Sequence, residues 1–142
     1  FSDYIGTVLK DPKNWTIDTL DEVEFHPSFQ KNGIRHIVAD MWSFVKDKQF
    51  HGSYATVFML DCGGAWWDSP SVEKTIQMIA EVLPVVAVGG SLHVSKIMAM
   101  LNPDENERTV FVGTLANRIG DAFVVTSERL LHSELIVVER IS

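Results

Sequence analysis

The sequence predicts an α/β fold built around a mostly parallel sheet, and three observations lead to this class. Apolar runs at residues 34–39 and 55–60 are each followed directly by an aspartate, as expected for buried strands that end at a ligand-binding edge. A helix-like apolar stripe follows at residues 69–83. Two β-branched runs, residues 122–126 and 135–138, then close the chain as an antiparallel pair.

The amino-terminal third of the chain has a less regular pattern. Residues 4–10 form a short apolar piece that fits the end of a helix as well as a strand, and an Asp-Pro step stops it. Residues 15–23 alternate loosely and end among acidic side chains, which is typical of a strand with an acidic exit. An Asn-Gly turn signal precedes residues 34–39, which predict a strand that ends at Asp40.

The middle of the chain has the clearest pattern. Residues 55–60 are apolar at nearly every position, as expected for a strand buried on both faces, and they stop at Asp61. Residues 69–83 predict a helix because Ser69 can cap it, a proline suits its first position and apolar side chains recur at helical spacing. After a Gly-Gly step, residues 91–98 alternate as a strand.

Size, charge and cysteine content limit the classes of protein to which the chain can belong. Its 142 residues are 46% hydrophobic and 22% charged, which suits one core, so we expect a single domain over residues 1–142. The net charge of -7 implies that any RNA would bind at a local basic patch. Cys62 is the only cysteine, which excludes an internal disulfide and favours a reducing, cytoplasmic setting.

No segment of the sequence predicts a membrane span or a secretory signal. The longest uncharged stretch, residues 82–95, contains a proline, two adjacent glycines and His93. No basic segment followed by an apolar run opens the chain. We therefore expect no membrane partner. The first residue is Phe1 rather than Met, from which we expect that an upstream segment is missing.

Three charged side chains at predicted strand positions are candidates for chemistry. Asp61 either faces a ligand crevice or caps the next turn, and we favour the crevice because Asp40 repeats the arrangement one strand earlier. Lys96 lies inside an apolar strand, where an ammonium group is unfavourable unless it is paired, and a partly desolvated lysine can act as a general base. Glu134 begins the last strand and gains significance only together with the other two.

Other patterns carry less weight. The five histidines show no metal-ligand spacing, so we expect no metal site. A Gly-Gly-Ser-Leu-His segment lacks the second glycine of a nucleophile elbow, which makes a serine hydrolase a weak candidate. Trp66 and Trp67 fit the core or a lid, and exposed indoles there would be able to stack on a nucleobase. Residues 109–113 form a weaker apolar piece to which the pattern assigns no element.

The order of these motifs resembles that of the S-adenosylmethionine-dependent RNA 2'-O-ribose methyltransferases, especially the viral cap methyltransferases. In that family a Lys-Asp-Lys-Glu tetrad surrounds the acceptor ribose hydroxyl. Asp61 matches the aspartate, Lys96 in Gly-Gly-Ser-Leu-His-Val-Ser-Lys matches the second lysine, and Glu134 in Ser-Glu-Leu-Ile-Val matches the glutamate. The similarity covers about residues 15–138.

The resemblance implies a Rossmann-like three-layer sandwich, mostly parallel, with an antiparallel strand near the C-terminus. It also implies methyl transfer from S-adenosylmethionine to a ribose 2'-hydroxyl of capped RNA, within a viral capping or replication protein of the cytoplasm or virion. Lys96 would remove the proton or stabilise the alkoxide, while Asp61 and Glu134 would hold the lysine. This scheme needs no metal.

The same resemblance implies a cofactor site and a missing part of the fold. Asp40 and Met41 would contact the adenine of S-adenosylmethionine, and Asp18 or Asp21 would accept hydrogen bonds from its ribose. No glycine-rich cofactor loop precedes Trp15, and the first tetrad lysine is unmatched. We therefore expect the chain to be the C-terminal two-thirds of a larger domain, whose first strand and glycine loop come from the rest of a longer polypeptide or complex.

Two other functions stay open. A catalytically silent Rossmann-like scaffold or interaction module is favoured by the acidic net charge and by the missing glycine loop. A methyltransferase with a small-molecule or protein acceptor is also compatible with the pattern, and in that protein Lys96 and Glu134 would be incidental.

Overall fold

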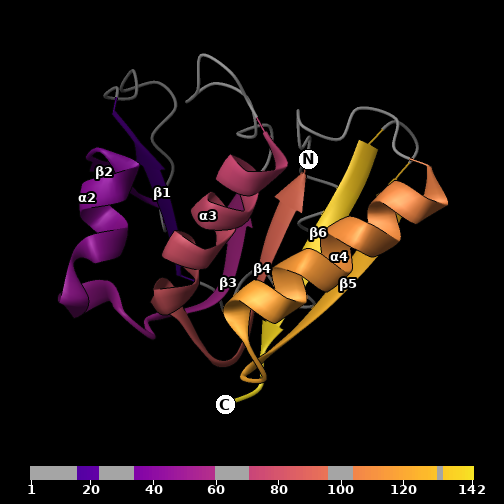
Figure 1. Cartoon of the computed structure of the whole chain (residues 1–142). Helices are drawn as coiled ribbons and strands as arrows, with labels where there is room; N and C mark the ends of the chain where they lie inside the picture. The colour runs from indigo at the N-terminus through magenta and orange to yellow at the C-terminus, as the bar shows by residue number, and fades with distance from the viewer. Residues whose placement is uncertain (1–15, 23–33, 60–70, 96–103, 131–132) are drawn as a thin grey trace. The chain divides into compact units, whose positions relative to one another are not determined.

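A computed structural model describes residues 16–22, 34–59, 71–95, 104–130 and 133–142 of the chain (Figure 1). The described elements are β1 (Ile17–Asp21), β2 (Ile34–Val38), α2 (Met41–Lys46), η3 (Lys48–Phe50), β3 (Tyr54–Met59), α3 (Val72–Val82), η4 (Leu83–Val85), β4 (Val86–Ser95), α4 (Glu105–Ile119), β5 (Phe123–Leu130) and β6 (Ser133–Arg140). The chain divides into two compact units, Phe1–Lys46 and Asp47–Ser142. The predicted piece at residues 4–10 lies outside the described residues.

The first unit contains a two-stranded parallel sheet. β1 and β2 pair in register from Ile17 opposite Ile34 to Asp21 opposite Val38. The pairing confirms the strands predicted within residues 15–23 and 34–39. β1 ends at Asp21, and Asp40 follows the last residue of β2 by two positions, so both carboxylates belong to the same end of the sheet, where the carboxyl ends of parallel strands meet.

The second unit contains a four-stranded sheet in the order β3-β4-β6-β5. β3 and β4 are parallel, while β6 is antiparallel to both of its neighbours, β4 and β5. β6 is therefore the strand of this sheet that runs against the other three. The predicted class, a mostly parallel sheet with an antiparallel strand near the C-terminus, is confirmed, and so is the predicted pairing of residues 122–126 with 135–138.

Helices α3 and α4 pack on one face of this sheet (Figure 1). On that face Leu92 of β4 lies opposite Val138 of β6, and Val94 lies opposite Ile136. All four side chains are almost completely buried. Burial of this apolar layer against helices α3 and α4 stabilises the second unit.

Strand β3 is less buried than its apolar sequence predicts. Among the described residues it has one neighbour, β4, and it lies at the edge of the four-stranded sheet. Met59 is buried, Ala55 is exposed, and the rest of the strand is half-buried. Within the described residues the strand is only partly buried, which differs from the predicted strand buried on both faces.

Helix α3 begins two residues later than predicted. Ser71, and not Ser69, is the N-cap residue, since its hydroxyl accepts a hydrogen bond from the backbone N–H of Lys74 at 3.2 Å. Ser71 also has the extended backbone that this position requires. The predicted apolar stripe is confirmed, because Ile76 and Ile79 are both buried.

Helix α4 is an element that the sequence pattern missed. Asp104 caps it by accepting a hydrogen bond from the Glu107 backbone N–H at 2.7 Å. Its buried apolar side chains are Phe111 and Leu115, with the exposed Gly113 between them. Two buried positions on a fifteen-residue helix give a weak periodic signal. The helix is held by packing against β5 and α3 rather than by a strong apolar stripe of its own.

The Gly-Gly step lies inside strand β4 and not in a turn before it. Gly89 has a φ of 81°, and a Cβ on Gly90 would lie 2.6 Å from the carbonyl oxygen of Ala55 in β3. The pairing of β3 with β4 is irregular at this point, between Tyr54 and Thr56. The two glycines therefore permit a close approach of neighbouring strands, which is a second reason for adjacent glycines besides a turn.

Candidate functional site

The side chains of the three predicted catalytic residues are not among those that the structure describes. Asp61 and Lys96 lie outside the described residues, as do Trp66 and Trp67. Glu134 belongs to β6, where its backbone pairs with Arg129 of β5, but its side chain is not among those described. The proposed contact between Lys96 and the two carboxylates stays a prediction.

The ends of three strands nevertheless meet at one edge of the four-stranded sheet. Met59, the last residue of β3, pairs with Val94 of β4. Ser95, the last residue of β4, pairs with Leu135 near the start of β6. In open sheets this carboxyl edge is where ligands bind. The sheet edge that the sequence predicts for chemistry is therefore built from β3, β4 and β6.

A buried histidine lies next to this edge on β4. His93 is 6% exposed, its Nε2 lies 2.9 Å from the Ser91 hydroxyl, and its ring centroid lies 5.1 Å from that of Phe58. Burial lowers the pKa of His93, and the charges of Glu128 and Glu139 oppose this effect. His93 is therefore a buried, hydrogen-bonded residue of β4 whose protonation is disfavoured by burial.

Asp18, one of the two carboxylates predicted to bind the cofactor ribose, is engaged in an ion pair. Arg35 lies directly opposite on β2, and its Nη2 and Nε donate to the two Asp18 oxygens at 2.6 and 3.1 Å. The Asp18 side chain is 12% exposed. Asp21, at the end of β1, has an exposed side chain. Of the pair Asp18 and Asp21, Asp21 is the stronger candidate for a hydrogen bond to a ligand.

Asp40, predicted to contact the adenine, caps helix α2. One of its carboxylate oxygens accepts hydrogen bonds from the backbone N–H and the hydroxyl of Ser43, both at 3.0 Å. The Ser43 N–H is the main reason why the pKa of Asp40 is lowered; the Glu22 side chain also lowers it. Met41, the second residue predicted at the adenine, is half-buried at the start of α2.

Asp21, Glu22 and Asp40, which we call the acidic strand ends, thus follow two neighbouring parallel strands. Glu22 was not among the predicted site residues, although its place directly after a strand was a usable signal. Carboxylates accept hydrogen bonds from hydroxyl and amino groups and attract cations. The arrangement suits a ligand that carries such donors or a positive charge.

Neither a metal-binding cluster nor a membrane-spanning helix is found among the described residues. Within the described ranges, no group of three or more His, Cys, Asp or Glu side chains is placed to hold a metal ion. None of the helices in the described part of the chain is long and apolar enough to cross a membrane.

The four-stranded sheet, with three strands in one direction, an antiparallel β6 and helices α3 and α4 on one face, has a Rossmann-like α/β fold. A solved structure that resembles it is a protein from Corynebacterium glutamicum, with 17% sequence identity and a TM-score of 0.50, a match that covers 83% of this chain and 50% of that one. Another is a candidate rRNA methylase from Clostridium thermocellum, with 16% identity and a TM-score of 0.47, covering 78% of this chain and 59% of that one.

The chain thus spans about half the length of the first of these structures and 59% of the second. At 17% identity, the likeness to the Corynebacterium glutamicum protein supports the fold and does not extend to an activity. No protein family model and no curated protein sequence matches the chain.

Proposed function

We propose that this chain is part of an S-adenosylmethionine-dependent methyltransferase that acts on a ribose 2'-hydroxyl of RNA. The observation that carries the proposal is the strand order. β6 is antiparallel and lies between β4 and β5, so its first residues lie at the carboxyl edge of β3 and β4. An antiparallel strand near the C-terminus is what the resemblance in motif order implies.

The same strand order supports a catalytic role for the three predicted residues. Lys96 directly follows Ser95 of β4, and Glu134 directly precedes Leu135 of β6. Ser95 and Leu135 are paired residues, so Lys96 and Glu134 are each one residue away from a shared position at the sheet edge. Asp61 follows the end of β3 by two residues, on the neighbouring strand. The described strand ends next to which the three residues stand in the sequence lie at one edge of the sheet, which supports the proposed grouping.

In this proposal each side chain has a defined task. Lys96 takes the proton of the ribose hydroxyl or stabilises the resulting alkoxide. Asp61 and Glu134 orient the lysine and compensate its charge. The acceptor is the 5' end of a capped RNA, in viral mRNA cap formation within a cytoplasmic replication complex or virion, an assignment that rests on the order of the motifs alone.

The acidic strand ends fit the proposed cofactor. The ribose hydroxyls and the adenine amino group of S-adenosylmethionine are hydrogen-bond donors, and its sulfonium is a cation, so carboxylates suit all three. Asp21 would accept from the ribose, and Asp40 with Met41 would lie against the adenine. When bound, the cofactor supplies an electrophilic methyl group. The glycine-rich loop of the family would come from outside residues 1–142.

The first test compares Lys96→Ala with the unchanged protein in a methyl-transfer assay on capped RNA. Loss of a positioned general base lowers the rate by about 10²- to 10⁴-fold. Calorimetric titration of S-adenosylmethionine should give the same affinity for both proteins, because Lys96 acts on the acceptor. Lys48→Ala removes an exposed lysine of η3 and serves as the matched control. Full activity of Lys96→Ala would contradict the assigned mechanism.

A catalytically silent Rossmann-like module is the second candidate function. The observation that favours it is that two of the predicted cofactor carboxylates already have structural partners, Arg35 for Asp18 and Ser43 for Asp40. Calorimetry distinguishes the two functions directly. If S-adenosylmethionine gives no binding heat with the unchanged protein or with the longer polypeptide that supplies the glycine loop, the silent module is the correct function.

A further inference from the structure

A pocket of about 560 Å³ lies at the edge of the four-stranded sheet opposite to the predicted active-site edge. It is formed where β4 and β5 begin and where β6 ends, since Phe123 at the start of β5 pairs with Arg140 at the end of β6. The backbone N–H of Gly52 donates to the Pro84 carbonyl at 2.8 Å and joins the segment before β3 to this region. Its volume lies within the range of small-ligand sites, about 300–1,000 Å³.

The lining of the pocket, which we call the cationic pocket, carries positive charge, whereas the chain as a whole is acidic. Its lining includes His51, Arg118 and Arg140, and no carboxylate among the described residues. Neither arginine forms an ion pair with an Asp or Glu side chain among the described residues. Asp47 lies close enough to interact with His51, so His51 is the most compensated of the three. Two arginines without acidic partners, in a chain of net charge -7, indicate a preference for an anion.

Arg140 is held in place by two backbone carbonyls. Its Nη1 donates to the Val86 carbonyl at 2.7 Å, and its Nε donates to the Ser142 carbonyl at 3.2 Å. A guanidinium has five N–H donors, so these two bonds orient the group and leave other donors for a ligand. The Val86 carbonyl is neutral and does not cancel the charge. A guanidinium oriented in this way is well suited to bind a phosphate.

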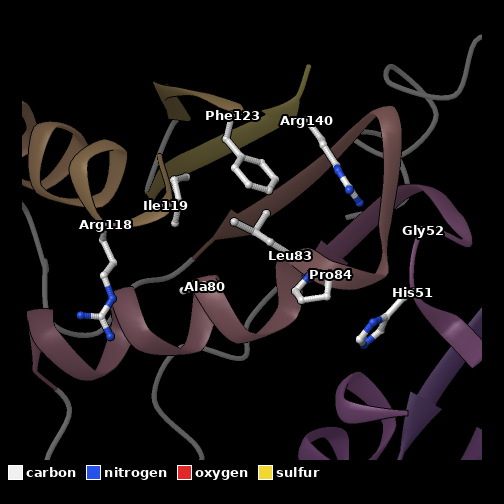
Figure 2. Close-up of a pocket in the computed structure, with 9 residues that line it drawn as sticks. All are labelled: His51, Gly52, Ala80, Leu83, Pro84, Arg118, Ile119, Phe123 and Arg140. Atoms are coloured by element: carbon white, nitrogen blue, oxygen red, sulfur yellow. The ribbon is translucent and has the colours of Figure 1, made fainter. Parts of the chain in front are cut away.

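Apolar side chains form the middle of the pocket, between its charged ends. Figure 2 shows Leu83 and Phe123 between Arg118 at one end and Arg140 with His51 at the other. Leu83 is buried and Phe123 is half-buried, so the aromatic ring still presents surface to the pocket. A planar apolar group stacks favourably on such a ring.

The geometry points to a nucleotide unit as the ligand of the cationic pocket, with a phosphate on Arg140 and His51 and the base against Phe123 and Leu83. Arg118 then lies where a second phosphate would be. This inference stands on the pocket itself and does not depend on methyl transfer. The unit can belong to a free nucleotide or to a single-stranded RNA, since both carry the same phosphate and base.

The test measures binding of adenosine 3',5'-bisphosphate, which carries two phosphates, by calorimetry and of a short fluorescein-labelled single-stranded RNA by anisotropy at low salt. Arg118→Gln should weaken binding of the ligand that the pocket takes by about tenfold, because one charge-assisted contact is lost. Arg140→Gln should weaken it at least as much. Arg108→Gln, which removes a positive charge from the same helix outside this pocket, is the matched control and should have little effect.

Because Arg140 also bonds the backbone of β4, its variant is tested for folding by circular dichroism, while the exposed Arg118 gives an independent answer. Arginine-dependent binding of adenosine 3',5'-bisphosphate assigns the pocket to free nucleotides, and binding of RNA alone assigns it to a strand; both support the inference. It is overturned if neither probe binds, or if Arg108→Gln weakens binding as much as Arg118→Gln. Titration of S-adenosylmethionine into Arg118→Gln should be unchanged, so failure of the proposed methyl transfer is distinguishable.

Discussion

The acidic strand ends and the cationic pocket hold their charges in opposite ways. The Asp40 carboxylate caps helix α2 by accepting from Ser43, three residues away. The Asp18 carboxylate of β1 is paired with Arg35 on the neighbouring strand β2. The Arg140 guanidinium instead donates to the backbone oxygens of Val86 and Ser142, and neither Arg118 nor Arg140 forms an ion pair with an Asp or Glu side chain in the described part of the chain. The comparison teaches that charge satisfied locally stabilises the fold, whereas charge left uncompensated is available to a ligand.

The largest expected effect comes from the strand contact beside the cationic pocket. Gly90→Ala places a Cβ 2.6 Å from the Ala55 carbonyl oxygen, a backbone atom that cannot move alone. We expect a loss of about 2–3 kcal/mol in the free energy of unfolding, measured by urea denaturation. The displaced start of β4 would also move the Val86 carbonyl that holds Arg140, so nucleotide binding should weaken together with stability.

Gly113→Ala is the matched control for this change. Gly113 lies in the interior of α4, and a Cβ there meets no atom within 4 Å. Alanine restricts the unfolded chain and suits a helix better, so the free energy of unfolding should rise by about 0.5–1 kcal/mol. If the two variants were destabilised equally, the close approach of β3 and β4 at Gly90 would not be the cause.

An intermediate effect is expected at the acidic strand ends. Asp21→Asn removes a negative charge and an acceptor from the proposed ribose site, so affinity for S-adenosylmethionine should fall by about tenfold in a calorimetric titration. Asp40→Asn separates structure from binding, since asparagine caps helices as well as aspartate does. Asp40→Asn should leave the unfolding temperature nearly unchanged and still lower the affinity for S-adenosylmethionine. If both variants bound S-adenosylmethionine as tightly as the unchanged protein, these carboxylates would not belong to the proposed site.

The smallest effect concerns His93, a buried group that is neither acidic nor part of the cationic pocket. Its pKa is lowered in the folded protein because burial disfavours the imidazolium. Below about pH 6.5 the unfolded chain therefore binds more protons than the folded one, and stability declines as the pH falls through this range. His93→Gln should show a smaller difference in unfolding free energy between about pH 7.5 and about pH 5.5. His51→Gln, at an exposed position, should keep the full difference.

Elements with strong local periodicity were predictable from the sequence. The stripe of α3 and the pairing of β5 with β6 follow from residue spacing, because a helix or strand that buries one face repeats its apolar side chains at a fixed period. Helix α4 was missed because Phe111 and Leu115 are its buried apolar positions and Gly113 interrupts it. The strand of residues 91–98 was predicted to follow Gly89 and Gly90 rather than to contain them, because glycine is compatible with several backbone geometries and a close strand contact is visible only once both strands are placed.

The sequence by itself determined the kind of fold and the order of the elements along the chain, because periodicity and strand exits are local properties. It also pointed to Asp21 and Asp40 as residues that follow strands. Only the tertiary structure decided that Asp18 is bound by Arg35 and that Arg118 and Arg140 line one pocket with Phe123. These contacts join residues far apart in the chain, and no local pattern encodes which distant side chains the packing of the sheet and helices brings together.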